Sequence, residues 1–298
     1  MQVELPAADT VAGPGPGSAP AGAAGRRRQP RWRRLLEQGL PPLLVLMVVL
    51  AAWYGVSYLL LSPERRFLVP PPHAVVQVGF LTRDNLVELL DALALTTRVA
   101  LVGLAIAVTV GMSTAILMHQ ARWIERSVYP YAVVLQTIPI LALVPLFGFW
   151  FGFGMVSRVL VCVLIALFPI IANTLFGLQS VEPSQHDLFT LHTAGRLTRL
   201  WKLELPAALP AIFTGLRISA GLSAIGAIVG DFFFRQGPPG IGILIDLYRA
   251  RLQSEQLFAA VIFSSLLGVV VFWCFGLLAR RVVGRWHGSG RDPRPRGP

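Results

Sequence analysis

A short polar segment, residues 186–204, holds the side chains best suited to chemistry in an otherwise apolar chain. Its ionisable members are two histidines, two carboxylates and three basic residues: His186, Asp187, His192, Arg196, Arg199, Lys202 and Glu204. Histidine and aspartate side chains can ligate a metal ion. However, the spacing of His186 and His192 places them about 240° apart on a helix, so they do not converge on one ion. We therefore expect no metal site and interpret the segment as a docking surface for a partner in water.

Enzymatic chemistry has no matching motif in this sequence. There is no Gly-x-x-x-x-Gly-Lys-Ser/Thr phosphate loop, and Lys202 is the only lysine, so the chain cannot by itself hold ATP in the P-loop manner. A nucleophile elbow and a zinc-protease helix motif are also missing. We expect a protein that is not an enzyme and that carries no cofactor of its own.

Two prolines, Pro206 and Pro210, follow the polar segment. Each lacks an N–H donor and disfavours the helical conformation at the residue before it. The pattern predicts a short helix and then a turn before the chain enters the next apolar stretch.

The composition indicates a membrane protein. Of the 298 residues, 54% are hydrophobic and only 14% are charged, which is far more apolar than a soluble domain. The net charge of +11 could suggest a nucleic-acid partner, but the arginines lie beside apolar stretches rather than in one patch interleaved with aromatic residues. The two cysteines, Cys162 and Cys274, lie inside apolar runs, which argues against a disulfide framework. We expect an all-α protein in a lipid bilayer.

Six apolar stretches are long enough to cross a bilayer, which takes roughly 20 residues. They cover residues 43–61, 99–118, 131–151, 159–178, 211–230 and 257–278. The first has no small-residue cleavage site after it, so we interpret it as a retained anchor rather than a signal peptide. Six spans place both termini on the same side of the membrane.

The distribution of basic residues predicts which side that is. With the N-terminus inside, the inside segments hold more than two thirds of the 26 lysines and arginines. Because positive residues favour the cytoplasmic side, we expect residues 186–204 and both termini to be cytoplasmic.

The polar segment also resembles the cytoplasmic loop of ATP-binding-cassette (ABC) importer permeases. The motif of that loop reads Glu-Ala-Ala, three residues, Gly, nine residues, Ile, one residue, Leu-Pro. Counting back from Leu205-Pro206 places Leu203 at the Ile position, Thr193 at the Gly position and Asp187 at the Glu position. The coupling residues that this resemblance implies are Asp187, Thr193, Ala194, Gly195, Arg196, Leu203, Leu205 and Pro206.

Further stretches, including Ile138-Pro139, Phe168-Pro169 and Gly240-Ile241-Gly242, resemble the nitrate/sulfonate/taurine branch of these permeases. The resemblance covers roughly residues 93–285 and implies a type I ABC importer bundle of six transmembrane helices. The chain is then divided into a disordered basic cytoplasmic tail (1–36), a first transmembrane helix with a periplasmic segment (37–92), a permease core (93–285) containing the coupling loop (179–210), and a cytoplasmic tail (286–298).

The resemblance implies the partners and the location. Family members form a homodimeric pore in the bacterial plasma membrane, with a periplasmic solute-binding protein above and a dimeric ABC ATPase below. ATP is used by that separate subunit, and a short coupling helix of the loop sits in a groove on it. Nitrate, a sulfonate, and a pyrimidine or flavin vitamin precursor all remain open as the solute, because the binding protein supplies most of the recognition.

A few polar residues inside the spans are candidates for a translocation path. Gln136 and Thr137 precede Pro139 in the third span, and Ser219 and Ser223 belong to the small-residue series of the fifth. A proline frees backbone carbonyls, which is tolerated where the site faces protein or a watery path. The alternative, about equally favoured for Gln136, is a hydrogen bond that joins two helices.

Two other classes of protein compete with the permease. A secondary transporter would need ion-coupling charges near the midplane and usually an inverted repeat, neither of which is evident here. A membrane assembly protein without an ATPase partner would explain the hydrophobicity but not the proline-closed polar segment. We therefore favour the permease of an ATP-driven importer.

Overall fold

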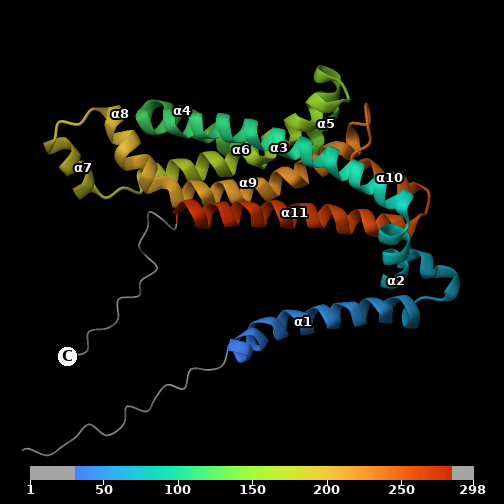
Figure 1. Cartoon of the computed structure of the whole chain (residues 1–298). Coiled ribbons are helices and arrows are strands. Elements are labelled where there is room, and N and C mark those ends of the chain that lie inside the picture. Colours follow the sequence, from blue (N-terminus) through green and yellow to red (C-terminus); the bar gives the residue numbers. More distant parts are fainter. Residues whose placement is uncertain (1–30, 284–298) are drawn as a thin grey trace, which may run out of the picture. The chain divides into compact units, whose positions relative to one another are not determined.

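The computed structural model describes residues 31–283, and in that range the chain forms helices joined by short turns, without a strand (Figure 1). This confirms the expected all-α fold. The predicted tails, 1–36 and 286–298, lie outside the described residues, except that residues 31–36 already belong to the first helix. The chain divides into two units, Met1–Ala51 and Ala52–Pro298, which we describe separately.

Helix α1 (Arg31–Gly55) makes up the described part of the first unit and ends just inside the second. It continues directly into a π-helical turn, η1 (Val56–Leu60). Together, Gly39–Leu60 are long and apolar enough to cross a membrane. The predicted span at 43–61 therefore coincides with a helix.

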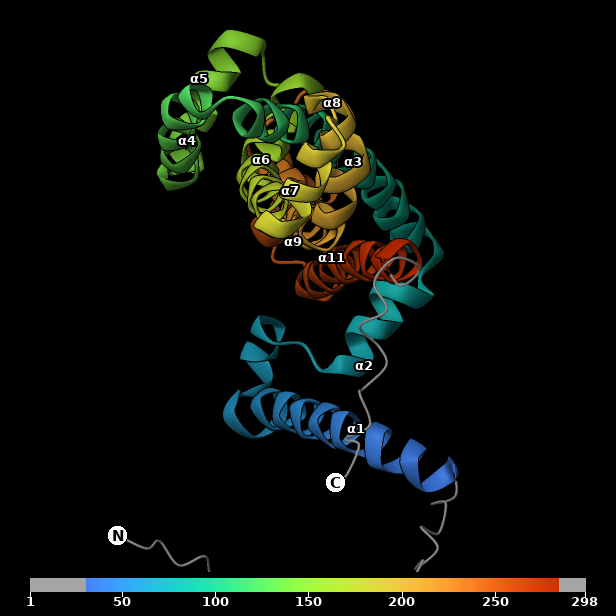
Figure 2. The same cartoon turned by 90° about the vertical axis from the view of Figure 1, so that its left-hand side faces the viewer.

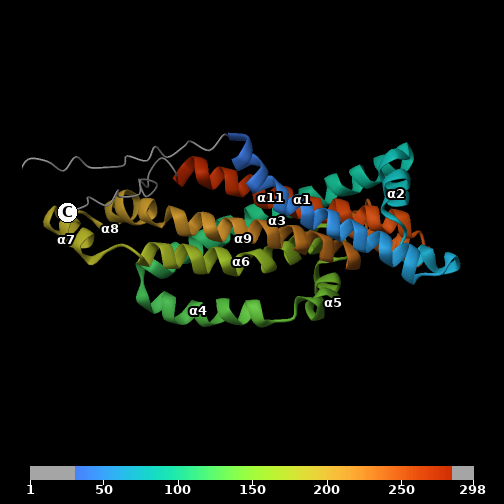
Figure 3. The same cartoon turned by 90° about the horizontal axis from the view of Figure 1, so that it is seen from below.

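Four long helices run side by side in the second unit (Figures 1 and 3): α3 (Arg83–Gln120), α6 (Met155–Gln179), α9 (Leu205–Phe233) and α11 (Ser254–Val283). Helix α6 packs against both α3 and α9, and α11 packs against α9. Each of the four contains one predicted span and passes the length and hydropathy criteria for a membrane helix.

Small residues allow α9 to approach its neighbours closely. A Cβ atom on Gly226 would lie 3.0 Å from the Cα of Cys162 in α6, so a larger side chain would force the two helices apart. Ala220 and Ala224 are buried in one cluster with Ala166 of α6. These residues of α9 belong to the small-residue series of the fifth predicted span. Its buried members pack α9 against other helices of the same chain.

The third predicted span, residues 131–151, is broken rather than continuous. The chain forms α4 (Arg122–Thr137) and α5 (Ile140–Phe151), and the two axes are bent by 100° at the break. Pro139 cannot donate to the helical ladder, and Ile138 before it is extended, with φ −67° and ψ 126°. The described residues thus contain five helices able to cross a membrane, or six when the bent pair counts as one.

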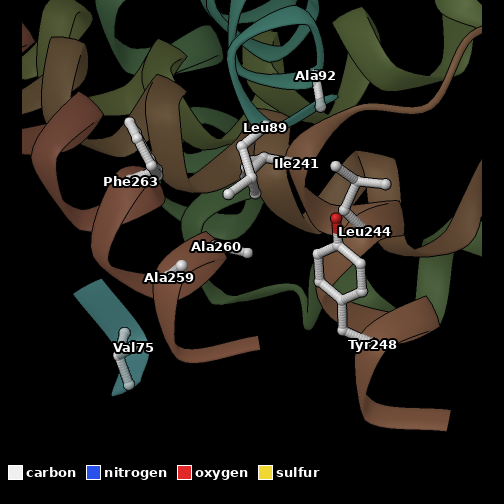
Figure 4. Close-up of a cluster of buried hydrophobic side chains, with 9 residues drawn as sticks. All are labelled: Val75, Leu89, Ala92, Ile241, Leu244, Tyr248, Ala259, Ala260 and Phe263. Carbon is white, nitrogen blue, oxygen red and sulfur yellow. The ribbon is translucent and has the colours of Figure 1, made fainter. Parts of the chain in front are cut away.

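Short elements close one end of the bundle. They are η2 (Pro63–Leu68), α2 (Pro72–Val75), η3 (Val76–Leu81) and α10 (Ile241–Ala250). Apolar side chains of α2 and α10 pack with those of α3 and α11 in the cluster drawn in Figure 4: Val75, Leu89, Ala92, Ile241, Leu244, Tyr248, Ala259, Ala260 and Phe263. This end is therefore held by a packed core of its own.

Candidate functional site

The segment between α6 and α9 projects from the end of the bundle opposite α10 (Figure 1), and Figure 2 views the molecule from that end. It contains α7 (Pro183–Leu191), α8 (Arg196–Arg199) and the π-helical turn η4 (Leu200–Glu204). Pro183 lies in the first turn of α7, where its missing N–H leaves no hydrogen bond unmade. We call residues 183–204 the projecting segment; it lies within the predicted coupling loop.

Helix α7 ends in a backbone turn that needs a left-handed residue. The N–H of Ala194 donates to the Phe189 carbonyl at 3.0 Å, and the N–H of Thr193 donates to the Thr190 carbonyl at 2.9 Å. This pair of bonds is the Schellman arrangement, in which the residue after the C-cap is usually glycine. Here Thr193 takes that place with φ 50°, an uncommon conformation for a β-branched residue. The family motif has its glycine at the same position.

The predicted turn before the next span is wrong. Helix runs without interruption from Arg196 to Phe233, through both Pro206 and Pro210. The π-helical turn absorbs the first proline: the N–H of Leu205 bonds to the Leu200 carbonyl, five residues back, and Pro206 then follows in the first turn of α9. A wider turn there keeps the backbone helical where an α-helix would meet a missing donor.

The predicted coupling residues are spread along the projecting segment and the start of α9. Asp187 is exposed in α7, and the residue that caps α7 is Glu182, so Asp187 is not a helix cap. Gly195 caps α8 and is exposed, as is Arg196. Thr193 is exposed as well. The remaining four coupling residues are half-buried: Ala194, Leu203, Leu205 and Pro206.

Large apolar side chains of the projecting segment face outward. Their exposed fractions are 54% for Leu188, 82% for Leu191, 70% for Leu197 and 68% for Trp201. The surrounding positions are polar, and exposed apolar side chains gathered in a polar segment mark an interaction surface.

The base of the projecting segment is fixed to the bundle. Leu200 is buried in a cluster with Leu178, Ala208 and Ile212. The Oε2 atom of Glu204 lies 3.0 Å from Nε2 of His119 at the end of α3, and Glu204 is only 6% exposed. Sequence reasoning missed this pair. The available signal was a carboxylate between two leucines, Leu203 and Leu205, at the start of an apolar stretch.

The structure does not bring the predicted path residues together. Gln136, Thr137 and Pro139 are exposed around the break between α4 and α5, and Gln136 lines a cavity of about 260 Å³ together with side chains of α6 and α9. Ser219 is buried and donates to the Ala166 carbonyl of α6 at 2.7 Å. Ser223 is also buried and bonds within its own helix. In the single chain, Ser219 joins two helices.

At the opposite end, a buried ion pair joins α6 to α9. Nη1 of Arg158 lies 3.2 Å from Oδ1 of Asp231, and both side chains are almost fully buried. Thr96 of α3 donates to the other carboxylate oxygen at 2.6 Å. The Arg158 guanidinium also donates to the carbonyls of Phe234, at 2.8 Å, and Gln236, at 3.3 Å. Arg158 lies between the predicted spans 131–151 and 159–178, and Asp231 directly follows the span 211–230, so sequence reasoning missed the pair.

Helix α10, next to this pair, carries two further charge contacts. Asp246 accepts hydrogen bonds from Arg249 and from Arg235, and these guanidinium groups lower the pKa of the Asp246 carboxyl below its usual range. Tyr248 donates to Glu88 at 2.9 Å, and burial together with this carboxylate raises the pKa of the Tyr248 phenol. Tyr248 therefore remains a donor at neutral pH.

Known proteins resemble this chain over most of its length. Residues 107–284 match the family described as "Binding-protein-dependent transport system inner membrane component". The formylaminopyrimidine transport permease ThiX of Halalkalibacterium halodurans is 32% identical over 79% of this chain and 91% of its own length. The riboflavin permease RibX of Chloroflexus aurantiacus is 32% identical over 88% of this chain and 97% of its own length. The taurine permease TauC of Escherichia coli is 28% identical over 89% of this chain and 95% of its own length.

These matches span the bundle, the bent α4–α5 pair and the projecting segment together, and the taurine permease confirms the branch indicated by the sequence. The fold, the membrane-spanning helices and the matches agree with one another. The chain belongs to the family of inner-membrane components of binding-protein-dependent transport systems and is the permease subunit of an ABC importer.

Proposed function

We propose that this permease works as a homodimer and that its projecting segment docks on the dimeric ABC ATPase in the cytoplasm. The observation that carries the proposal is the set of exposed apolar side chains on α7 and α8, above all Leu191 at 82% and Leu197 at 70%. They lie within the loop that the resemblance implies as the coupling loop, between the predicted coupling residues Asp187 and Leu203. Both termini are then cytoplasmic, and α10 faces the solute-binding protein.

Movement of the ATPase would reach the bundle through one continuous helix. Because Arg196–Phe233 is helical throughout, a force on α8 acts directly on α9. The contact between Glu204 and His119 couples the same point to α3. ATP-driven closure of the ATPase would thus reorient α9 and α3 together and open the path outward. Hydrolysis would return the dimer to its inward-facing state.

The solute would be a small molecule delivered by the binding protein. Relatives of similar identity are named for formylaminopyrimidine, riboflavin and taurine, which differ in size and charge. One permease scaffold that serves such different solutes favours recognition by the binding protein. The exposed Gln136 at the α4–α5 break is the polar side chain that we propose for the path.

The docking proposal is tested by matched substitutions at the two ends of the bundle. Leu191→Asp introduces a charge into the proposed contact, and we expect loss of co-purification with the partner ATPase and of ATPase stimulation in proteoliposomes. Leu252→Asp is the control, because Leu252 is also exposed, at 67%, but lies after α10. Asp187→Arg should also lower stimulation, since Asp187 is exposed in α7 and caps no helix. If the Leu191→Asp and Leu252→Asp variants co-purify with the ATPase equally well, the projecting segment is not the ATPase contact.

A further inference from the structure

A polar cavity of about 700 Å³ lies behind the projecting segment. Its wall is formed by the junction of α3 and α4, the end of α6, and residues of α7, α8 and η4. Three arginines from two separate parts of the chain line it: Arg122 from the start of α4, and Arg196 and Arg199 from α8. The cavity therefore connects the projecting segment with the bundle.

The charges of this cavity are not balanced. Its two carboxylates are not paired with the arginines: Glu125 accepts a hydrogen bond from the neutral Gln179 amide at 2.9 Å, and Glu204 lies 3.0 Å from His119. The three guanidinium groups therefore exceed the two carboxylates of the lining by one charge. None of the ion pairs within the described residues involves one of the three arginines. Three guanidinium groups around one cavity, without a carboxylate partner in that part of the chain, produce a positive potential that favours an anion.

Arg199 supplies a second, independent indication. One of its terminal nitrogens, Nη2, donates to Oγ1 of Thr190 at 3.0 Å. Its Nε atom is buried and has no hydrogen-bond partner among the described residues. A buried donor without an acceptor is costly, so such groups are nearly always bonded to protein, water or a ligand.

We propose that this cavity binds a phosphate group, held by Arg122, Arg196 and Arg199. Guanidinium groups match phosphate oxygens in geometry and form charge-assisted hydrogen bonds with them. The phosphate could belong to a small soluble molecule or to a phospholipid headgroup, since both present the same oxygens. The bound group links α8 to the α3–α4 junction and so holds the projecting segment in one position. This regulatory consequence rests on the proposed docking function; the binding itself does not.

The test uses the full-length permease without its ATPase, purified in detergent and depleted of lipid. Calorimetric titration with pyrophosphate at constant ionic strength should give saturable binding of one equivalent per chain. Arg122→Gln and Arg199→Gln should each weaken this binding by about tenfold or more, because each removes a charge-assisted contact. Arg251→Gln, which lies at the other end beyond α10, is the matched control and should leave the affinity unchanged.

A second variant guards against misfolding. Glu125→Gln removes a negative charge from the cavity wall, so it should tighten pyrophosphate binding, a gain that a damaged protein would not show. Absence of saturable binding to the unmodified chain, or equal weakening by Arg251→Gln, would overturn the proposal. Because the ATPase is not present, failure here is distinguishable from failure of the docking function.

The same titration in lipid nanodiscs identifies the source of the phosphate. If a headgroup is the natural ligand, pyrophosphate binds in phosphatidylcholine nanodiscs but is displaced in nanodiscs that contain phosphatidylglycerol. If a soluble molecule is the ligand, pyrophosphate binds equally in both. Either result supports the phosphate site, and so does displacement in both kinds of nanodisc, because phosphatidylcholine also carries a phosphate. Absence of saturable binding in lipid-depleted detergent excludes the site.

Discussion

The two ends of the bundle differ in how they satisfy their charged and apolar groups. At the α10 end, Arg158 and Asp231 are paired and buried, and apolar side chains such as Leu244 and Phe263 fill a closed cluster. At the end with the projecting segment, leucines and a tryptophan are exposed and three arginines surround a cavity. The α10 end buries its ion pair and packs a closed cluster within the single chain, although Leu252 beside α10 is exposed. The other end carries groups that suit a partner. In the proposed mechanism, the α10 end is the fixed frame and the projecting segment receives the signal from the ATPase.

The largest expected contrast is the side of the membrane that each end faces. A cysteine introduced as Thr198→Cys should react with an impermeant thiol reagent only from the cytoplasmic side, and one introduced as Gln236→Cys only from outside. Both positions are exposed, so accessibility does not distinguish them. The measurement is labelling of inside-out and right-side-out vesicles. Labelling of both cysteines from the same side would contradict the placement of the two ends on opposite sides of the membrane, and with it the proposed topology.

The next effect concerns the stability of the fixed end. Arg158→Met leaves Asp231 buried without its cation, and breaking a buried pair in this way costs about 3–5 kcal/mol. We expect a large drop in the midpoint of unfolding by denaturant. Arg235→Met is the control: Arg235 pairs with Asp246 but is 64% exposed, and exposed pairs contribute only about 0–1 kcal/mol. Equal losses in the two variants would contradict the assignment of this end as a rigid frame.

A smaller effect is expected at the left-handed residues, of which each end has one. Thr193 and Leu252 have φ 50° and 56°, a region that glycine enters without steric cost. Thr193→Gly should stabilise the end of α7 by about 1 kcal/mol, the order of the left-handed penalty. Slower amide hydrogen exchange at Ala194 would report this gain. Leu252→Gly provides the matching measurement at the other end, and a loss of protection in either variant would argue against strain at that site.

The smallest expected effect is the contribution of Asp246 to the pH dependence of folding stability. Its pKa is lowered by Arg249 and Arg235, so its contribution to stability is present above the ordinary carboxyl pKa and is lost as the pH falls through the lower folded value. Both guanidinium groups are more than 60% exposed, which limits the contribution to less than about 1 kcal/mol. Unfolding midpoints measured at decreasing pH should converge for the unmodified chain and Asp246→Asn. A constant difference across acidic pH would show that the pair is not ionic.

The sequence predicted the parts of the fold that depend on local pattern. Long apolar stretches indicated the helices α3, α6, α9 and α11, because a bilayer requires about 20 such residues. Motif spacing indicated the projecting segment and the position of Thr193, which the structure finds in the left-handed conformation. Both signals lie within short windows of the chain, so no knowledge of packing was needed.

The parts that sequence reasoning missed depend on contacts between residues distant in sequence, or on how the backbone replaces the hydrogen bond that a proline cannot make. Arg158 meets Asp231 across 73 positions, and His119 meets Glu204 across 85, so neither pair has a local pattern. Proline gave opposite results at two places. At Pro139 the chain breaks, whereas at Pro206 a π-helical turn precedes it and the helix continues. Proline rules predict a missing hydrogen bond but not how the surrounding backbone replaces it.

The uninterrupted helix Arg196–Phe233 also determines how far this protein reaches out of the lipid. A helix of 38 residues is about 57 Å long, nearly twice the roughly 30 Å of hydrocarbon in a bilayer. No ordinary tilt hides such a length, so the turns around α8 must emerge through the headgroup layer into water. Trp201 precedes the predicted span at 211–230 by ten residues, which is about 15 Å of helix, and Leu197 lies one turn farther out. A soluble partner can thus reach α8 without approaching the lipid surface.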